Sequence, residues 1–146
     1  PQPVAALLEV NVGRWEGKSW VEIEKDEPQA HHDFVTDPAT HGYAGGENLK
    51  QVQDRVLPAI EKLLAQHLGK IVLVVAHNVV NRVLLATLMH VPLAKARSVD
   101  QDNCGVNGAA MYERVRIKPY RDREAWPAPD NKWLTGIVPR RLGAPI

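Results

Sequence analysis

The sequence lacks what several classes of protein require. It has one cysteine, Cys104, which excludes an internal disulfide and a metal site built from several thiols. It has no run of about 18 apolar residues, so no transmembrane helix is expected. Its 18 basic and 17 acidic side chains leave a net charge of +1, and this balance favours neither a nucleic-acid nor a membrane partner. We therefore expect a protein of a reducing, cytoplasmic compartment.

The start of the chain also lacks a targeting segment. The first residues, PQPVAALLEVNVG, have neither a basic n-region nor a proper h-region, so no signal peptide is expected. The chain starts with Pro1 rather than methionine and enters a dense segment at once. We therefore expect that the natural beginning has been removed.

Charge and proline content divide the chain near residue 118. Residues 1–111 hold 10 basic and 13 acidic side chains, whereas residues 112–146 hold 8 basic and 4 acidic ones and five of the 11 prolines. This composition predicts a domain over 1–118 and a Pro/Arg-rich C-terminal tail over 119–146. The tail contains two tryptophans, Trp126 and Trp133, which favour a tail that wraps a surface of the protein.

The apolar spacing predicts helices around a buried strand. Residues 71–77, IVLVVAH, are apolar at every position before the histidine, which is typical of a parallel strand buried on both faces. Spacings of three, four and seven predict an amphipathic helix over about 49–64, stopped by Gly69 and kinked at Pro58. A second helix is expected from about 79 to 90.

Two weaker patterns complete the secondary structure. Ser19 and Glu22 form a capping box, so a short helix should run over 20–26 and end before Pro28. Residues 111–117 alternate between apolar and polar side chains, which predicts a strand with one solvated face. Helices that alternate with strands indicate the α/β class.

His77 is the first candidate for chemistry. It stands where the predicted strand ends and a helix begins, which is where open α/β folds bind ligands. The N–H groups of Asn78 and Val79 open that helix and form an anion site at the same place. The alternative is a histidine that only bonds a backbone carbonyl at a strand end.

Two loops contribute the other candidates. Glu9 follows the apolar run 4–8, so its carboxyl could be partly dehydrated and act as a general acid. Glu16 fits an ordinary loop carboxylate better. A Gly45-Gly46 pair lets backbone approach a ligand, and Glu47 is expected in the first turn of the following helix, where the dipole favours it. This is not a nucleotide phosphate loop, because the Gly-Lys-Ser/Thr ending is missing.

Other titratable residues fit structural roles better. Five of them could bind a divalent metal, although their spacing matches no established pattern: His31, His32, Asp33, Asp37 and His41. Cys104 could be a nucleophile in a thiol hydrolase of unrelated α/β fold, with His77 as its base, but a structural thiol is the better interpretation.

Three motifs occur in a specific order: EVNVGRWEG at 9–17, GGENL at 45–49, and VVAH at 74–77, leading into a helix. Together they resemble the histidine phosphatase superfamily, the phosphoglycerate-mutase-like group of phosphatases and mutases. The resemblance covers roughly residues 4–117. It implies a three-layer α/β/α fold with a mostly parallel sheet.

The resemblance also implies a mechanism. A histidine in an Arg-His-Gly motif attacks phosphorus and becomes a phosphohistidine, and a glutamate matching Glu9 protonates the leaving oxygen. A histidine matching His77 binds the phosphoryl oxygens with two arginines, and neither a metal nor a cofactor is required. We expect Asn78, Gly46 and Glu47 to contact the substrate or its phosphate.

This sequence departs from the family pattern in one large respect. It contains no Arg-His-Gly, because none of its six histidines follows an arginine, and the family's Ser-x-x-x-Arg-Ala stretch is absent before Glu9. Asn78 also replaces the usual glycine after the second histidine. The chain therefore resembles the C-terminal part of the family, truncated at its N-terminus.

The predicted function is a phosphoric monoester hydrolase that acts on a phosphorylated small molecule. Val12 stands where mutases carry a substrate-contacting tyrosine, which favours hydrolysis over a phosphoglycerate-mutase-type transfer. The alternatives are a non-catalytic phosphate-binding module and one half of a two-chain enzyme. Because the family's first strand lies beside the strand that ends in His77, we expect a partner chain, a second copy or the tail to cover the edge of 71–77.

Overall fold

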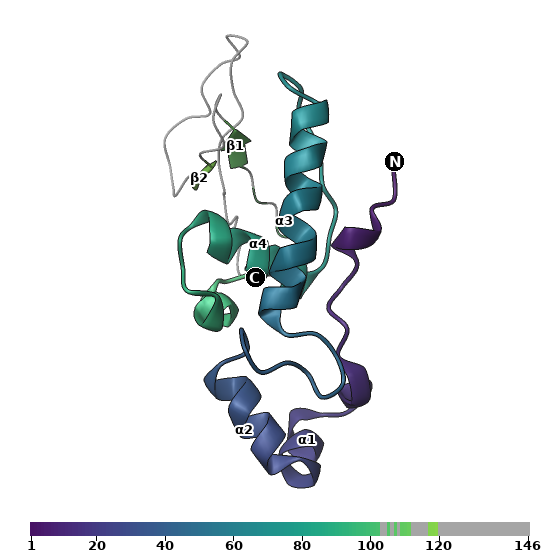
Figure 1. Cartoon of the computed structure of the whole chain (residues 1–146), viewed down its shortest axis with the longest axis vertical. Helices are drawn as coiled ribbons and strands as arrows, with labels where there is room; N and C mark the ends of the chain where they lie inside the picture. The colour runs from purple at the N-terminus through teal and green to yellow at the C-terminus, as the bar shows by residue number, and fades with distance from the viewer. Residues whose placement is uncertain (103–104, 106, 108, 112–116, 120–146) are drawn as a thin grey trace, which may run out of the picture.

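The helices of the protein form two groups, one large and one small, joined by extended loops (Figure 1). The computed structural model describes residues 1–102, 105, 107, 109–111 and 117–119. The α-helices are α1 (Trp20–Asp26), α2 (Pro28–Thr36), α3 (Leu49–Gln66) and α4 (Asn78–Leu88). Short 3₁₀ turns are η1 (Ala5–Leu7), η2 (Gly13–Trp15) and η3 (Leu93–Ser98), and the strands are β1 (Ala109–Met111) and β2 (Ile117–Pro119).

The predicted helices are confirmed, and their ends follow from local chemistry. The Ser19 hydroxyl accepts the Glu22 N–H, while the Glu22 carboxylate accepts the Ser19 N–H, which completes the predicted capping box of α1. An equivalent box between Asn48 and Gln51 begins α3. The helix continues through Pro58; the kink there stays a prediction.

Helix α2 was not predicted, because Pro28 was interpreted only as the end of the preceding helix. Pro28 is the first residue of α2. Proline is favoured at this position, where its missing N–H would have no intrahelical acceptor and its φ already suits the helix. The same residue therefore ends α1 and begins α2.

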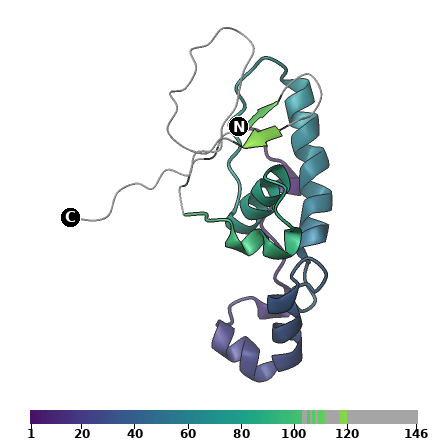
Figure 2. The same ribbon diagram turned by 90° about the vertical axis from the view of Figure 1, so that its left-hand side faces the viewer.

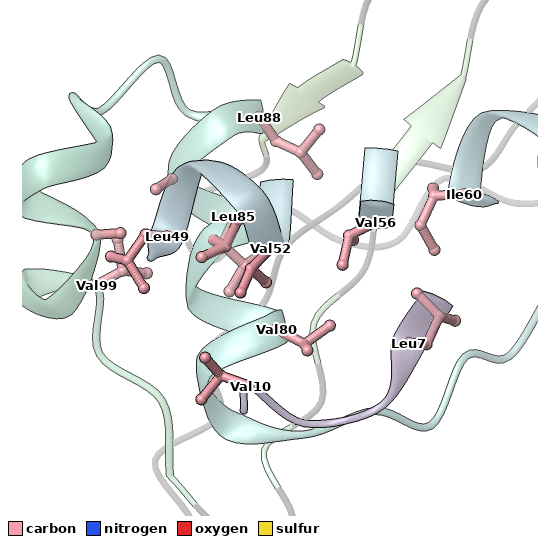
Figure 3. Close-up of a cluster of buried hydrophobic side chains, with 13 residues drawn as sticks. Leu7, Val10, Leu49, Val52, Val56, Ile60, Val80, Leu85, Leu88 and Val99 are labelled. Carbon is pink, nitrogen blue, oxygen red and sulfur yellow. The ribbon is translucent and has the colours of Figure 1, made fainter. Parts of the chain in front are cut away.

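The main core lies between α3 and α4 and is closed by η1 and η3 (Figure 3). Its members are Leu7, Val10, Leu49, Val52, Val56, Ile60, Val80, Val83, Leu85, Ala86, Leu88, Ala96 and Val99. The α3 members recur at spacings of three and four, which places them on one helix face. Burying each larger aliphatic side chain contributes about 1.5–3 kcal/mol. This core fixes the N-terminal end of α4 against the segment after η1.

A second, aromatic cluster holds α1 and α2 to the loops beside them. Trp15 is its centre, with ring centroids 5.4 Å from Phe34, 5.9 Å from Tyr43 and 6.1 Å from Trp20, all in edge-to-face geometry. Such pairs are worth about 0.5–1.5 kcal/mol each beyond their buried area. Tyr43 packs against both clusters, so it links the two groups of helices.

The predicted strand at 71–77 is wrong in this structure. The segment runs back along α3 without forming a strand (Figures 1 and 2). Ile71, Leu73 and Val75 are 80%, 83% and 86% exposed, while Ala76 packs on the main core. A strand requires a neighbouring strand for its backbone hydrogen bonds, and the described residues supply none here. The predicted burial of both faces is therefore also wrong.

Of the strand predicted over 111–117, only Met111 and Ile117 lie within the described residues, and they belong to two different short strands. β1 and β2 are antiparallel, and Met111 pairs with Ile117, so the two ends of the predicted strand lie side by side. Within the described ranges this pair is the whole sheet, and the predicted mostly parallel sheet is not seen. The predicted tail lies outside the described residues apart from Pro119, as do Trp126 and Trp133. No described helix is long and apolar enough to cross a membrane.

Candidate functional site

Glu9 lies against the first turn of α4. It follows η1 and Leu8, is half-buried, and accepts a hydrogen bond from its own neighbour, Val10 N, at 2.9 Å through Oε1. Its other oxygen, Oε2, accepts the N–H of Val79 at 3.4 Å. The first N–H groups of a helix have no intrahelical acceptor and carry partial positive charge. The carboxylate therefore bonds one of these donors across 70 positions of sequence.

His77 is the N-cap residue of the same helix. Its backbone is extended, with φ −113° and ψ 168°, and its carbonyl accepts the N–H of Asn81 at 2.9 Å. The side chain is exposed and makes no hydrogen bond within the described part of the chain. The structure thus brings Glu9 and His77 to one helix end, although His77 reaches it from a loop rather than from a strand.

The side chain of Asn78 is already engaged by protein groups. Its Oδ1 accepts Arg82 Nε at 2.8 Å, and its Nδ2 donates to the Gln101 carbonyl at 3.3 Å. Arg82 also donates to the carbonyls of Arg97, at 2.6 Å, and Val99. What Asn78 offers a ligand is therefore its backbone N–H in the first turn of α4, rather than its amide.

Gly46 and Glu47 contact the loop that follows Glu9. The placement of Glu47 in the first helical turn is wrong, because α3 has Asn48 as its N-cap and Glu47 comes before it. The N–H of Glu47 donates to the Asn11 carbonyl at 2.8 Å, and the Glu47 carboxylate accepts the Asn11 N–H at 2.9 Å. A Cβ on Gly46 would lie only 2.1 Å from the Asn11 carbonyl oxygen. The close backbone approach predicted for the glycine pair is thus made to the protein's own loop.

Arg55 of α3 joins these pieces, although no motif of the sequence marks it. Its Nε donates to Glu47 Oε1 at 2.7 Å and its Nη2 to Oε2 at 3.0 Å. The same guanidinium donates to three carbonyls, those of Ala6 at 2.7 Å, Leu8 at 2.8 Å and Glu9 at 3.3 Å. The segment that carries Glu9 is therefore fixed to α3 by one side chain.

The pair between Arg55 and Glu47 has an electrostatic consequence. The Arg55 hydrogen bonds lower the pKa of the Glu47 carboxyl from its ordinary value, with smaller help from the Asn11 N–H and against partial burial. Glu47 therefore stays ionised to a lower pH than a free glutamate does. Its charge is balanced within the protein.

Tyr43, which packs against both clusters, was not marked by any motif of the sequence. Burial raises the pKa of the Tyr43 hydroxyl; the Arg97 charge acts in the opposite direction, and the Glu9 charge adds to the rise. One hydroxyl thus lies within electrostatic range of both charged groups. Arg97 lies between Ala96 and Ser98 in η3, and no local pattern of the sequence marks it.

The remaining sequence candidates lie apart from this helix end. His31 contacts the Trp20 ring, with centroids 5.7 Å apart, and Glu16 is exposed in its loop. Among the residues that the structure describes, no three His, Cys, Asp or Glu side chains are grouped as a metal site requires. Cys104 lies outside those residues.

The sequence matches known proteins over most of the chain. Residues 1–118 match the model of the histidine phosphatase superfamily (branch 1). Phosphoserine phosphatase 1 of Hydrogenobacter thermophilus is 31% identical over 111 residues, which are 76% of this chain and 53% of that protein. A metal-independent phosphoserine phosphatase of Arabidopsis thaliana is 37% identical over 82 residues, 54% of this chain and 34% of that protein.

Solved structures show the same likeness. Bacillus stearothermophilus YhfR superposes with a TM-score of 0.69 and 30% identity, over 78% of this chain and 56% of that one. A mycobacterial glucosyl-3-phosphoglycerate phosphatase bound to inorganic phosphate gives a TM-score of 0.65 at 24% identity, over 79% of this chain and 59% of that one, which is a likeness of fold alone. The matched residues cover between 34% and 59% of the length of these proteins.

Proposed function

We propose that this chain, which belongs to the histidine phosphatase superfamily (branch 1), carries the general acid and part of the phosphate site of a phosphoric monoester hydrolase. One observation supports this most directly: the Glu9 carboxylate bonds Val79 N in the first turn of α4, the helix whose N-cap residue is His77, and the His77 side chain is exposed. A proton donor and an anion site adjoin there, as hydrolysis of a phosphate ester requires.

Each group at this helix end has a chemical task in the proposal. The His77 ring and the Asn78 N–H donate hydrogen bonds to phosphoryl oxygens, whose negative charge the helix N-terminus also favours. Glu9, when protonated, gives its proton to the leaving alkoxide oxygen and afterwards helps activate water. Gly46, Glu47 and Arg55 hold the Glu9 segment in place, so their part in substrate binding is indirect.

The nucleophile of the proposed phosphohistidine mechanism is not among these 146 residues. None of the six histidines follows an arginine, so the family's Arg-His-Gly is missing from the sequence. Removing one member of a group of residues that act together removes nearly the whole rate enhancement. In this proposal the 146 residues bind phosphate without turning it over; the alternatives are a non-catalytic phosphate-binding module and one half of a two-chain enzyme. Val12, in place of the mutase tyrosine, favours hydrolysis over transfer.

The proposal predicts phosphate binding without turnover. In a titration of the ¹⁵N-labelled chain with inorganic phosphate, the amide signals of Asn78 and Val79 should shift. His77→Gln should weaken this binding about tenfold, as expected for the loss of one charge-assisted hydrogen bond. His32→Gln is the matched control, because His32 is exposed on α2 and should leave binding unchanged.

Turnover of an aryl phosphate by the chain alone should be negligible. A rate near the enzyme median, on the order of 10 s⁻¹, that His77→Ala abolishes would show that another nucleophile operates. Absence of any phosphate-dependent shift at Asn78 and Val79 would overturn the proposed function itself.

A partner for the 71–77 segment also belongs to the proposal. Three large apolar side chains within five positions, Ile71, Leu73 and Val75, are each more than three-quarters exposed, and such exposure favours association. We expect light scattering after size exclusion to give a mass above 16.2 kDa. Leu73→Glu should restore the monomer, whereas Val21→Glu, at a similarly exposed position on α1, should not. A monodisperse wild-type monomer would contradict this prediction.

A further inference from the structure

Arg82 joins the first turn of α4 to the end of η3 and the residue after it. Its Nε donates to Asn78 Oδ1 at 2.8 Å, one turn back along the helix. Its Nη1 donates to the Arg97 carbonyl at 2.6 Å and also to the Val99 carbonyl. The side chain is half-buried, and none of the ion pairs in the described part of the chain includes it. A planar guanidinium that bonds three acceptors at once is held in one orientation, so Arg82 is a rigid link.

The amide of Asn78 is fixed from its other side as well. Its Nδ2 donates to the Gln101 carbonyl at 3.3 Å. The Gln101 side chain is paired in turn with that of Asn107, whose Nδ2 donates to Gln101 Oε1 at 2.9 Å. Both polar atoms of the Asn78 side chain therefore have partners in the protein, one of them supplied by Arg82.

The bond from Arg82 matters because the Asn78 oxygen could otherwise compete with an anion. An asparagine oxygen at a helix start accepts first-turn N–H groups, as Asn48 Oδ1 does at the start of α3 at 2.8 Å. The first N–H groups of α4 have no intrahelical acceptor, and the His77 side chain caps none of them. Because Arg82 occupies the Asn78 oxygen, that oxygen is not available to them either.

We propose that Arg82 is a positioning residue of the phosphate site: it withholds the Asn78 oxygen from the first turn of α4 and so leaves the N–H groups of that turn to the phosphate. This rests on the proposed function, which places the phosphate at this helix end. Arg82 acts through Asn78 and takes no part in the bond cleavage. The family's usual glycine at this position has no amide oxygen, so this role of Arg82 arises with Asn78.

A double-mutant cycle on phosphate affinity tests the proposal. The ¹⁵N-labelled full chain is titrated with inorganic phosphate and followed at the Val79 amide. Arg82→Gln should weaken binding about fivefold, which corresponds to one neutral hydrogen bond that the phosphate must then displace. In the Asn78→Gly background no amide is released, so the same change should weaken binding less than about twofold. Urea unfolding of each variant measures its effect on stability separately.

Thr87→Val is the matched control, because it breaks a half-buried hydrogen bond near the other end of α4. Gln53 donates this bond to Thr87 Oγ1 at 2.8 Å. The control should lower stability and leave phosphate affinity unchanged. Arg82→Lys keeps the charge but loses the fork, so it should bind phosphate as weakly as Arg82→Gln. The same loss from Arg82→Gln in both backgrounds, or full affinity in Arg82→Lys, would overturn the role of Arg82 while the proposed function stands.

A measurement on the wild-type chain needs no variant to fold. Phosphate should shift the backbone N–H signals of Asn78 and Val79 more than the side-chain Nδ2 signals of Asn78, which stay bonded to Gln101. A larger shift of the side-chain signals would contradict the proposal, because the amide would then be the group that binds phosphate. If inorganic phosphate shifts none of these signals, the proposed function fails and this inference fails with it.

Discussion

Gly46→Ala is expected to lower the free energy of unfolding by about 3 kcal/mol or more, at the upper end of what overpacking costs. The added Cβ would lie 2.1 Å from the Asn11 carbonyl oxygen and 2.8 Å from the Gly13 nitrogen. Both are backbone atoms, so no change of rotamer relieves the overlap. The two loops must separate, which breaks the hydrogen bond from Glu47 N to the Asn11 carbonyl.

Gly17→Ala is the matched control for this prediction. Gly17 has φ +73°, but no atom lies within 4 Å of a Cβ built there. Its cost is therefore backbone strain alone, about 1–2 kcal/mol for a left-handed residue. Urea unfolding of both variants measures the difference. Equal losses of stability would show that the approach of the two loops at Gly46 is looser than the structure has it.

The helices could be predicted from the sequence because the signals that set their ends are local. The Ser19–Glu22 box and the spacing of apolar residues in α3 act within a few residues of the helix they define. Local rules also explain the missed helix, since proline ends one helix and begins another. The signals that determine each helix therefore lie within the segment that forms it.

The segment 71–77 could not be predicted in the same way, because a strand depends on another part of the chain. Six apolar residues in a row indicate burial, but burial needs a surface and a strand needs a hydrogen-bonding neighbour. Among the described residues, α3 and α4 give Ala76 a surface and leave Ile71, Leu73 and Val75 outside. The apolar pattern of residues 71–77 alone therefore could not predict which of these side chains are buried.

The same distinction between local and distant signals applies to the candidate site. Glu9 and His77 stand out because each follows an apolar run, and the structure brings both to one helix end. Arg55 gave no such signal, because three of its acceptors are backbone carbonyls, 46 to 49 positions away in sequence. A carbonyl is present in every residue, so no residue type marks where a guanidinium will bind. Only the folded chain shows this contact.

Arg55→Ala should be among the most destabilising single changes in the described part of the chain. It removes the bonds from one half-buried guanidinium to Glu47 and to three carbonyls. Breaking a buried ion pair costs about 3–5 kcal/mol, and partial exposure of this pair reduces the expected loss to about 3 kcal/mol. Arg14→Ala, which breaks the exposed pair with Glu27, should cost about 1 kcal/mol or less.

The pH dependence of the Arg55 effect identifies its cause. The pKa of folded Glu47 lies below its ordinary value of 4.5 because Arg55 stabilises the carboxylate. The pair therefore stabilises the fold fully above that value, and its contribution falls as the pH drops through the lower, folded pKa. Urea unfolding of wild type and Arg55→Ala should show the largest difference near neutral pH and a smaller one in acid. A difference that stays constant down to pH values well below 4.5 would mean that Arg55 acts only through the carbonyls of the Glu9 segment.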